Sequence, residues 1–97
     1  MTTPTGIPQI RHVLASSRFE MLSDVHCAVL EYVLNGDTIT FTHTGVPAPL
    51  EGRGIGSQLA HVGLEYAREN SLKVIAACWF VAGYIERHKE YQPLLKN

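Results

Sequence analysis

The sequence predicts a single α+β domain, an α/β-type sandwich of three antiparallel strands, a helix, a further strand and a C-terminal helix. Three observations predict it: alternating strand-like runs up to Val46, helical spacing after a glycine-rich loop, and an apolar run beyond that helix. The chain has 97 residues with 45% hydrophobic and 18% charged content, which is typical of one folded domain.

Residues 1–16 carry Thr, Pro and Gly without periodicity, so we expect a flexible N-terminal arm before a domain at residues 17–97. This start lacks the basic residues and apolar core of a secretion signal, and no apolar run approaches the ~20 residues of a membrane span. We therefore expect a cytoplasmic protein without a membrane partner. A net charge of -1 gives no reason to expect nucleic acid as a partner.

The strand-like part begins near Arg18. The runs "RFEML" and "HCAVLEYVL" alternate and are rich in β-branched and aromatic residues, with the turn-forming letters "SD" and "NGD" after them. Asn35-Gly36 is a strong hairpin signal, and "DTITFTHTGV" then places Ile39 and Phe41 on one face. Three successive antiparallel strands are predicted.

Apolar residues at helical spacing predict an amphipathic helix over residues 57–70. The run "SLKVIAACWF", residues 71–80, favours a strand buried on both faces and placed beside the third strand by a right-handed crossover. A second helix is predicted over residues 81–88.

The loop "VPAPLEGRGIGSQL" joins the third strand to the first helix. Gly52, Gly54 and Gly56 permit close backbone approach, and the free amides of a helix N-terminus favour an anion such as phosphate. No lysine follows Gly56, as a P-loop requires, and Ser57 takes the place of the sixth-position glycine of a dinucleotide fingerprint. The alternative is that these glycines only permit a tight strand-to-helix turn.

Besides this loop, the stretches "HTGVP", "LKV" and "FVAGYIERHKEYQPLL" and the lone cysteine at the end of the apolar strand belong to a resemblance that covers about residues 17–95. The chain resembles the short YjdJ-type branch of the GNAT superfamily of acyl-CoA-dependent N-acetyltransferases. One position departs from the superfamily motif, which begins with Gln or Arg three residues before its first glycine. Glu51 stands there, and it either weakens cofactor affinity or points to solvent.

The resemblance implies a GNAT-like fold with acetyl-CoA as cofactor and CoA as product. Amides of the loop and first helical turn would bind the pyrophosphate with help from an arginine, a splayed strand end would pair with the pantetheine arm, and a basic cluster would be available to a phosphate or simply cap its helix. The implied pyrophosphate-binding residues are Gly54, Ile55, Gly56 and Ser57, with Arg53 as the arginine. The implied pantetheine-binding residues are Thr44, Gly45 and Val46, and the basic cluster is Arg87 and His88.

Three side chains are candidates for catalysis. His43 suits a general base, or it is a half-buried histidine bonded to a carbonyl. Cys78 is a nucleophile, a proton donor or an inert core residue, with direct transfer favoured over an acetyl-cysteine intermediate. Tyr84 protonates the leaving CoA thiolate, as the resemblance implies, or is a core aromatic. Trp79 walls the substrate side or belongs to the core.

No CxxC or HxxxH spacing occurs, so we expect no metal, and we expect Cys27 and Cys78 to be free thiols. The leading hypothesis is an acetyl-CoA-dependent N-acetyltransferase whose amine acceptor is a protein lysine or N-terminus, or a small molecule. The alternative is a catalytically weak CoA-binding or sensing module acting through a partner. A structural interaction domain without a ligand is a third hypothesis.

Overall fold

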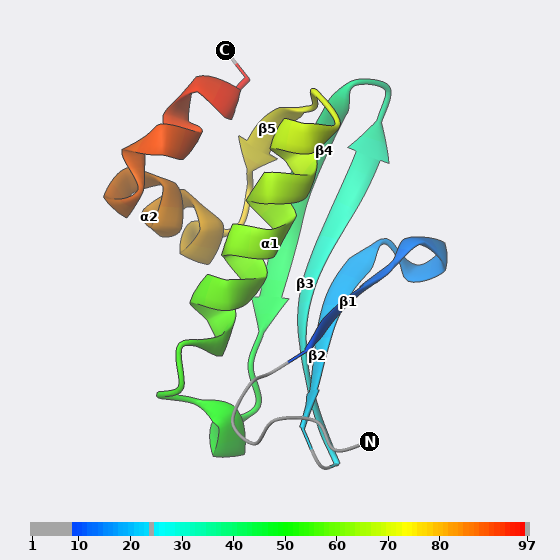
Figure 1. Cartoon of the computed structure of the whole chain (residues 1–97), viewed down its shortest axis with the longest axis vertical. Coiled ribbons are helices and arrows are strands. Elements are labelled where there is room, and N and C mark those ends of the chain that lie inside the picture. The colour runs from blue at the N-terminus through cyan, green and yellow to red at the C-terminus, as the bar shows by residue number, and fades with distance from the viewer. Residues whose placement is uncertain (1–8, 24, 97) are drawn as a thin grey trace.

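The computed structural model describes residues 9–23 and 25–96. They form one five-stranded sheet in the order β1-β2-β3-β4-β5, antiparallel except for the parallel pair β4–β5 (Figure 1). In chain order the elements are β1 (Ile10–Val13), η1 (Leu14–Ser16), β2 (Arg18–Ser23), β3 (His26–Asn35), β4 (Thr38–Gly45), η2 (Ala48–Leu50), α1 (Ile55–Glu69), β5 (Lys73–Ala76), α2 (Trp79–Arg87) and η3 (Lys89–Leu94). Across the described ranges, none of the helices has the length and apolar character needed to cross a bilayer.

The predicted α+β class is confirmed, as is the order of its predicted elements. β2, β3 and β4 pair antiparallel in succession, and the chain then passes through α1 to β5, which lies parallel to β4. The helix boundaries differ by two residues, because α1 begins at Ile55 and α2 at Trp79.

The prediction of a flexible arm over residues 1–16 is wrong in its second half, while residues 1–8 lie outside the described part. β1 pairs with β2 from Ile10 opposite Met21 to Val13 opposite Arg18. A four-residue strand offers too few positions for a recognisable period, and its place is decided by contacts far along the chain. The domain therefore extends back at least to Ile10 rather than to residue 17.

His12 anchors β1 to the sheet. Its ring stacks on Phe19 with centroids 4.1 Å apart, and its Nε2 lies 2.6 Å from the Tyr32 hydroxyl. Tyr66 of α1 meets the same imidazole edge-on. Burial in this aromatic cluster lowers the pKa of His12 from its ordinary 6.5.

We expect folding stability to fall as the pH drops below 6.5, the ordinary pKa of the His12 side chain. The native state keeps this imidazole neutral, so below that pH the unfolded state binds more protons and is favoured. Urea unfolding between about pH 5 and pH 8 measures the effect. His12→Gln should flatten the slope, and an unchanged slope in that variant would assign the dependence to another group.

β5 is shorter and more exposed than predicted. It covers only Lys73–Ala76, and although Val74 is buried, Ile75 is 41% exposed. Trp79 and Phe80, which the sequence analysis placed in this strand, lie in α2. The prediction of burial on both faces fails because helices cover only one face of the sheet at this position.

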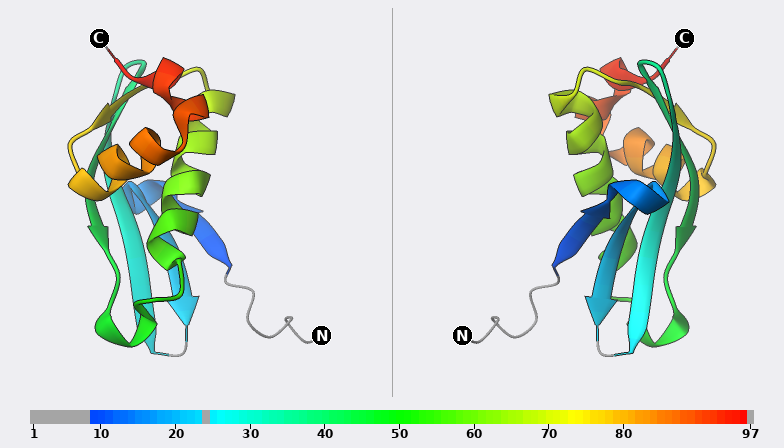
Figure 2. Two further views of the ribbon diagram at one scale, coloured as in Figure 1. Left: turned by 90° about the vertical axis from the view of Figure 1, so that its left-hand side faces the viewer. Right: turned by 90° about the vertical axis from the view of Figure 1, so that its right-hand side faces the viewer.

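α1 packs against one face of the sheet, and in the described part of the chain no α-helix lies over the opposite face of β2 and β3 (Figure 2). Gly63 allows the close approach of α1, because a Cβ there would lie 2.9 Å from Leu30 Cδ2. On the opposite face, Leu22 and Val33 are 52% and 56% exposed. One side of the sheet thus remains open to solvent.

The segment after α2 closes over α1. Tyr91 of η3 is buried, and its hydroxyl lies 2.9 Å from His61 Nδ1 and donates to Glu65 Oε2 at 2.6 Å. The guanidinium of Arg68 pairs with Glu65 and lies over the Tyr91 ring. These contacts hold η3 against α1 and so fix the end of α2.

Candidate functional site

β4 extends beyond the end of β5 and opens a gap in the sheet. Residues 38–41 of β4 pair with residues 73–76 of β5, and the Cys78 amide then donates to the Phe41 carbonyl at 3.0 Å. Beyond Phe41, β4 continues to Gly45 in pairing with β3 alone (Figure 1). Its backbone groups on the β5 side are therefore available to another extended chain, as the resemblance to splayed-strand enzymes implies.

A β-bulge at Thr42 decides which side chains reach each side of this gap. Tyr32 lies opposite Phe41, but Glu31 lies opposite His43, so Thr42 is the extra residue on β4. Its hydroxyl donates to the Glu31 carbonyl at 3.3 Å. After the bulge the alternation is reversed, which turns Thr44 to the α1 side and His43 to the uncovered face.

Cys78 occupies the α1 side of the gap as the N-cap residue of α2. Its Sγ lies 3.3 Å from the Thr44 hydroxyl across the opening. Burial alone would raise the pKa of this thiol, but hydrogen bonds from the Thr44 hydroxyl and from the Val81 and Phe80 amides lower the pKa of Cys78 below its ordinary value. The lowered pKa makes the Cys78 thiol a better proton donor than an unperturbed cysteine.

A hollow of about 420 Å³ leads from this gap to the first turn of α1. Its walls come from the end of β4, the glycine-rich loop, the start of α1 and the start of α2. The lining residues are Thr44, Val46, Leu50, Glu51, Gly52, Gly54, Ile55, Gly56, Ser57, Trp79 and Phe80. We call it the loop hollow.

The glycines of the loop have local structural reasons. Gly52 and Gly54 have φ of 84° and 74°, a left-handed backbone that favours glycine. A Cβ on Gly56 would lie 2.7 Å from Phe80 Cζ, so this position permits α1 to pack on α2. Turn geometry and helix packing therefore account for all three, and a ligand site must rest on other features.

Such a feature is the uncapped start of α1. Its N-cap residue Gly54 offers no side chain, and the first intrahelical acceptor is the Gly54 carbonyl, which receives the Gln58 amide at 3.1 Å. The preceding amides of Ile55, Gly56 and Ser57 consequently lack an intrahelical partner. They border the loop hollow, where they favour an anion.

Two charged residues precede these amides in the loop. Arg53 is exposed between Gly52 and Gly54, within the loop. Glu51 is also exposed and lines the loop hollow, so both expectations for it, an effect on cofactor affinity and a solvent-facing carboxylate, are compatible with its position.

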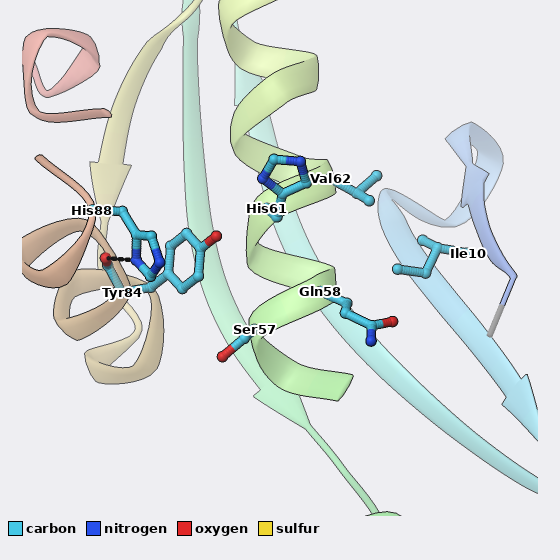
Figure 3. Close-up of a pocket in the computed structure, with 7 residues that line it drawn as sticks. All are labelled: Ile10, Ser57, Gln58, His61, Val62, Tyr84 and His88. Atoms are coloured by element: carbon cyan, nitrogen blue, oxygen red, sulfur yellow. Dashed lines mark hydrogen bonds between the residues drawn. The ribbon is translucent and has the colours of Figure 1, made fainter. Parts of the chain in front are cut away.

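A second hollow, of about 610 Å³, extends across the first half of α1 from α2 to Ile10 of β1, and Ser57 lines both hollows (Figure 3). Tyr84 and His88 reach it from α2 with their rings stacked 3.9 Å apart, and the Tyr84 hydroxyl points toward α1. The Tyr84 carbonyl is 2.9 Å from His88 Nδ1. The other lining residues are Ile10, Gln58, His61 and Val62.

The candidate catalytic residues fall into three places. Cys78 lies on the α1 side of the gap, His43 is exposed on the opposite face, and Tyr84 lines the second hollow instead of the loop hollow. Burial raises the pKa of Tyr84, so this phenol stays protonated. Of these three, Cys78 is the residue whose side chain contacts the Thr44 hydroxyl.

Two further predicted residues differ from expectation. Arg87 folds back along its own helix, with Nη1 3.4 Å from the Cβ position of Gly83, and it lines neither hollow. Trp79 is 83% exposed at the rim of the loop hollow, which contradicts a core role for its indole. Sequence reasoning did not place Glu31 opposite His43, although the consecutive polar pair Thr42-His43 after an alternating run is a signal for the bulge that does so.

No group of three or more His, Cys, Asp or Glu side chains arranged for a metal ion occurs among residues 9–23 and 25–96. Cys27 is half-buried, Cys78 is buried, and both are free thiols.

Comparison with known proteins adds independent observations. A family model described as GCN5-related N-acetyl-transferase matches residues 18–94. The solution structure of a GCN5-like protein from Staphylococcus aureus superposes with a TM-score of 0.72 at 32% identity, over 92% of this chain and 88% of that one.

Curated relatives match over a shorter stretch. Protein NATD1 of Xenopus tropicalis is 36% identical over 62 residues, which is 63% of this chain and 57% of that protein. Protein NATD1 of Homo sapiens is 37% identical over 62 residues, 63% of this chain and 55% of its own length. The matched region thus spans little more than half of these relatives.

Proposed function

Since the chain belongs to the GCN5-related N-acetyltransferase family and has its GNAT-like α+β fold, we propose that it transfers the acetyl group of acetyl-CoA to a primary amine. The observation that carries this proposal is the gap where β4 extends beyond the end of β5. It adjoins a hollow that leads to unpartnered amides, with a thiol on one side and an imidazole on the other.

The residues around the loop hollow fit acetyl-CoA, which supplies an activated acetyl thioester. The free edge of β4 at Thr44, Gly45 and Val46 suits the amide groups of a pantetheine arm. The amides of residues 55–57 and the guanidinium of Arg53 suit a pyrophosphate.

The second hollow suits the nucleotide end of the same cofactor, because Ser57 lines both hollows. His88 and Tyr84 offer stacked ring surface there. Arg87 is a weaker candidate than expected, since its side chain lies over Gly83.

We assign the two proton transfers to opposite sides of the gap. His43 takes a proton from the amine nitrogen as that nitrogen bonds to the acetyl carbon. The Cys78 thiol gives a proton to the sulfur that leaves when the carbon–sulfur bond breaks. Cys78 is favoured over Tyr84 because its contact with Thr44 places it at the gap. This route is direct transfer.

A second candidate is a CoA-binding or sensing module with weak catalysis that acts through a partner. The exposed Glu51 carboxylate on the wall of the loop hollow favours it, because a negative charge there opposes an anionic cofactor. In either case a cytoplasmic location and a protein or small-molecule amine as acceptor remain predictions.

The chain's single tryptophan provides the test. Trp79 is 83% exposed at the rim of the loop hollow, so a ligand that enters should change its fluorescence. Titration with acetyl-CoA, CoA, ATP and NAD should give saturable changes with the two CoA species only. Thiol release from acetyl-CoA is then followed with a panel of primary amines.

Binding with turnover supports the enzyme, and binding without turnover for any amine supports the sensing module. No binding of either CoA species, in fluorescence or in thermal unfolding, would overturn both. In unfolding, a ligand at ~100 times its dissociation constant adds about 2.7 kcal/mol of stability.

Cys78→Ala should lower the transfer rate by about 10²-fold without abolishing it, because the variant loses a proton donor and keeps direct attack. Steady-state thiol release measures this change. Cys27→Ala is the matched control and should be unaffected, since Cys27 lies at the start of β3, where its thiol contacts the Ala28 carbonyl and not Thr44. An acetyl adduct trapped on Cys78 and seen by intact mass would replace direct transfer with a two-step route.

A further inference from the structure

A polar row crosses the uncovered face of the sheet and ends at the gap. The strand register places Arg18 of β2 opposite Glu31 of β3, and Glu31 opposite His43 of β4. Side chains directly opposed in antiparallel strands share a face, with Cβ atoms about 4.5–5.5 Å apart. Their neighbours Leu30 and Phe41 are buried toward α1, so this row faces the open side.

The arginine of this row is held by another carboxylate. Arg18 Nε bonds Glu20 Oε2 at 2.6 Å, and Arg11 Nη2 bonds Glu20 Oε1 at 2.9 Å. Glu20 is 5% exposed, and these hydrogen bonds from Arg11 and Arg18 lower the pKa of its carboxyl, which stays ionised. For the Glu31 carboxylate, the described residues supply no hydrogen bond or ion pair. Its charge is available to a ligand.

Gly45 leaves room for the imidazole beside the gap. A Cβ at this position would lie 3.0 Å from His43 Nε2 and 3.5 Å from Val29 Cγ2. The imidazole therefore leans along β4 over Gly45, toward the strand end that outruns β5. An acceptor that reaches the open face meets His43 Nε2 next to the edge assigned to the acetyl donor.

We propose that Glu31 and His43 form the acceptor side of the site. The Glu31 carboxylate holds a cationic primary amine on the uncovered face, and His43 takes one proton from the ammonium and passes it to solvent. His43 then takes the second proton as the neutral nitrogen bonds to the acetyl carbon. This inference rests on the proposed transferase function and narrows its substrate class. An ionised carboxylate beside an imidazole complements an alkylammonium group and gives no advantage to an uncharged aryl amine. His43 is the catalytic group, and Glu31 determines specificity.

Binding is tested without turnover by following the His43 imidazole resonances by NMR during titration with butylamine, with butanol as the uncharged comparison. We expect saturable shifts with butylamine only, and binding at least about tenfold weaker in Glu31→Gln. Glu69→Gln is the matched control, because Glu69 is exposed at the far end of α1. Equal binding in Glu31→Gln, or no shift in the unaltered protein, would overturn the proposal.

Kinetics provide a second readout. Glu31→Gln should raise KM for butylamine about tenfold or more, leave the rate with aniline unchanged, and be partly rescued by Glu31→Asp. A purely structural role would alter both acceptors alike. If CoA binds but no amine is acetylated, the transferase function fails, while the NMR titration still decides whether Glu31 holds an amine.

Discussion

Replacing Gly54 with valine is expected to weaken acetyl-CoA binding by about 100-fold or more while the protein stays folded. Gly54 has a φ of 74° at the N-cap of α1, where a β-branched residue is strained by about 1–2 kcal/mol or more. The loop must move to relieve this strain, and the amides of residues 55–57 move with it. The Trp79 fluorescence titration measures the affinity.

Gly36→Val is the matched control for this substitution. Gly36 has a φ of 61° in the turn between β3 and β4, and like Gly54 it has no neighbour within 4 Å of its Cβ position. Both variants should lose stability through the same strain, but only Gly54→Val should lose affinity. Equal affinity in the two variants would remove the loop from the cofactor site.

Local signals explain why much of the fold was predictable. Asn35-Gly36 marks the turn between β3 and β4, and the alternation of Ile39 and Phe41 identifies the buried face of β4. The helical spacing of apolar residues in α1 is likewise visible in its own sequence. The family could also be predicted from a local signal, because its loop motif is contiguous in the sequence. The YjdJ-type branch stays a prediction.

The features missed by the sequence analysis depend on contacts between distant segments. The contacts of His12 with Phe19 and Tyr32 hold β1 in the sheet, and no local sequence pattern indicates these contacts. β5 is buried on one face only, because no helix of the described residues covers the other face of the sheet at this position. The role of Gly56 depends on Phe80, which lies 24 residues further along the chain and packs on it only in the folded state.

Sequence reasoning singled out the loop, the end of β4 and Cys78, but it could not give their arrangement or place Glu31 opposite His43. Strict alternation along β4 would place Thr42 and Thr44 on one face and His43 on the other. It would also set His43 opposite a residue of β3 other than Glu31. The bulge sets His43 opposite Glu31 and leaves Thr44 against Cys78. One inserted residue thereby separates the proposed base from the proposed acid across the thickness of the sheet.

That separation leads to the second large effect: His43→Gln should lower kcat by about 10²–10⁴-fold, with CoA affinity unchanged. Affinity is retained because the loop hollow draws on Thr44 and the start of α1, on the side opposite His43. Steady-state rates across pH and the Trp79 titration measure the two quantities separately. His26→Gln, which removes an imidazole from the start of β3 outside both hollows, should change neither. A wild-type rate in His43→Gln would rule out His43 as the base, and direct transfer would then need its proton acceptor on the Cys78 side of the gap.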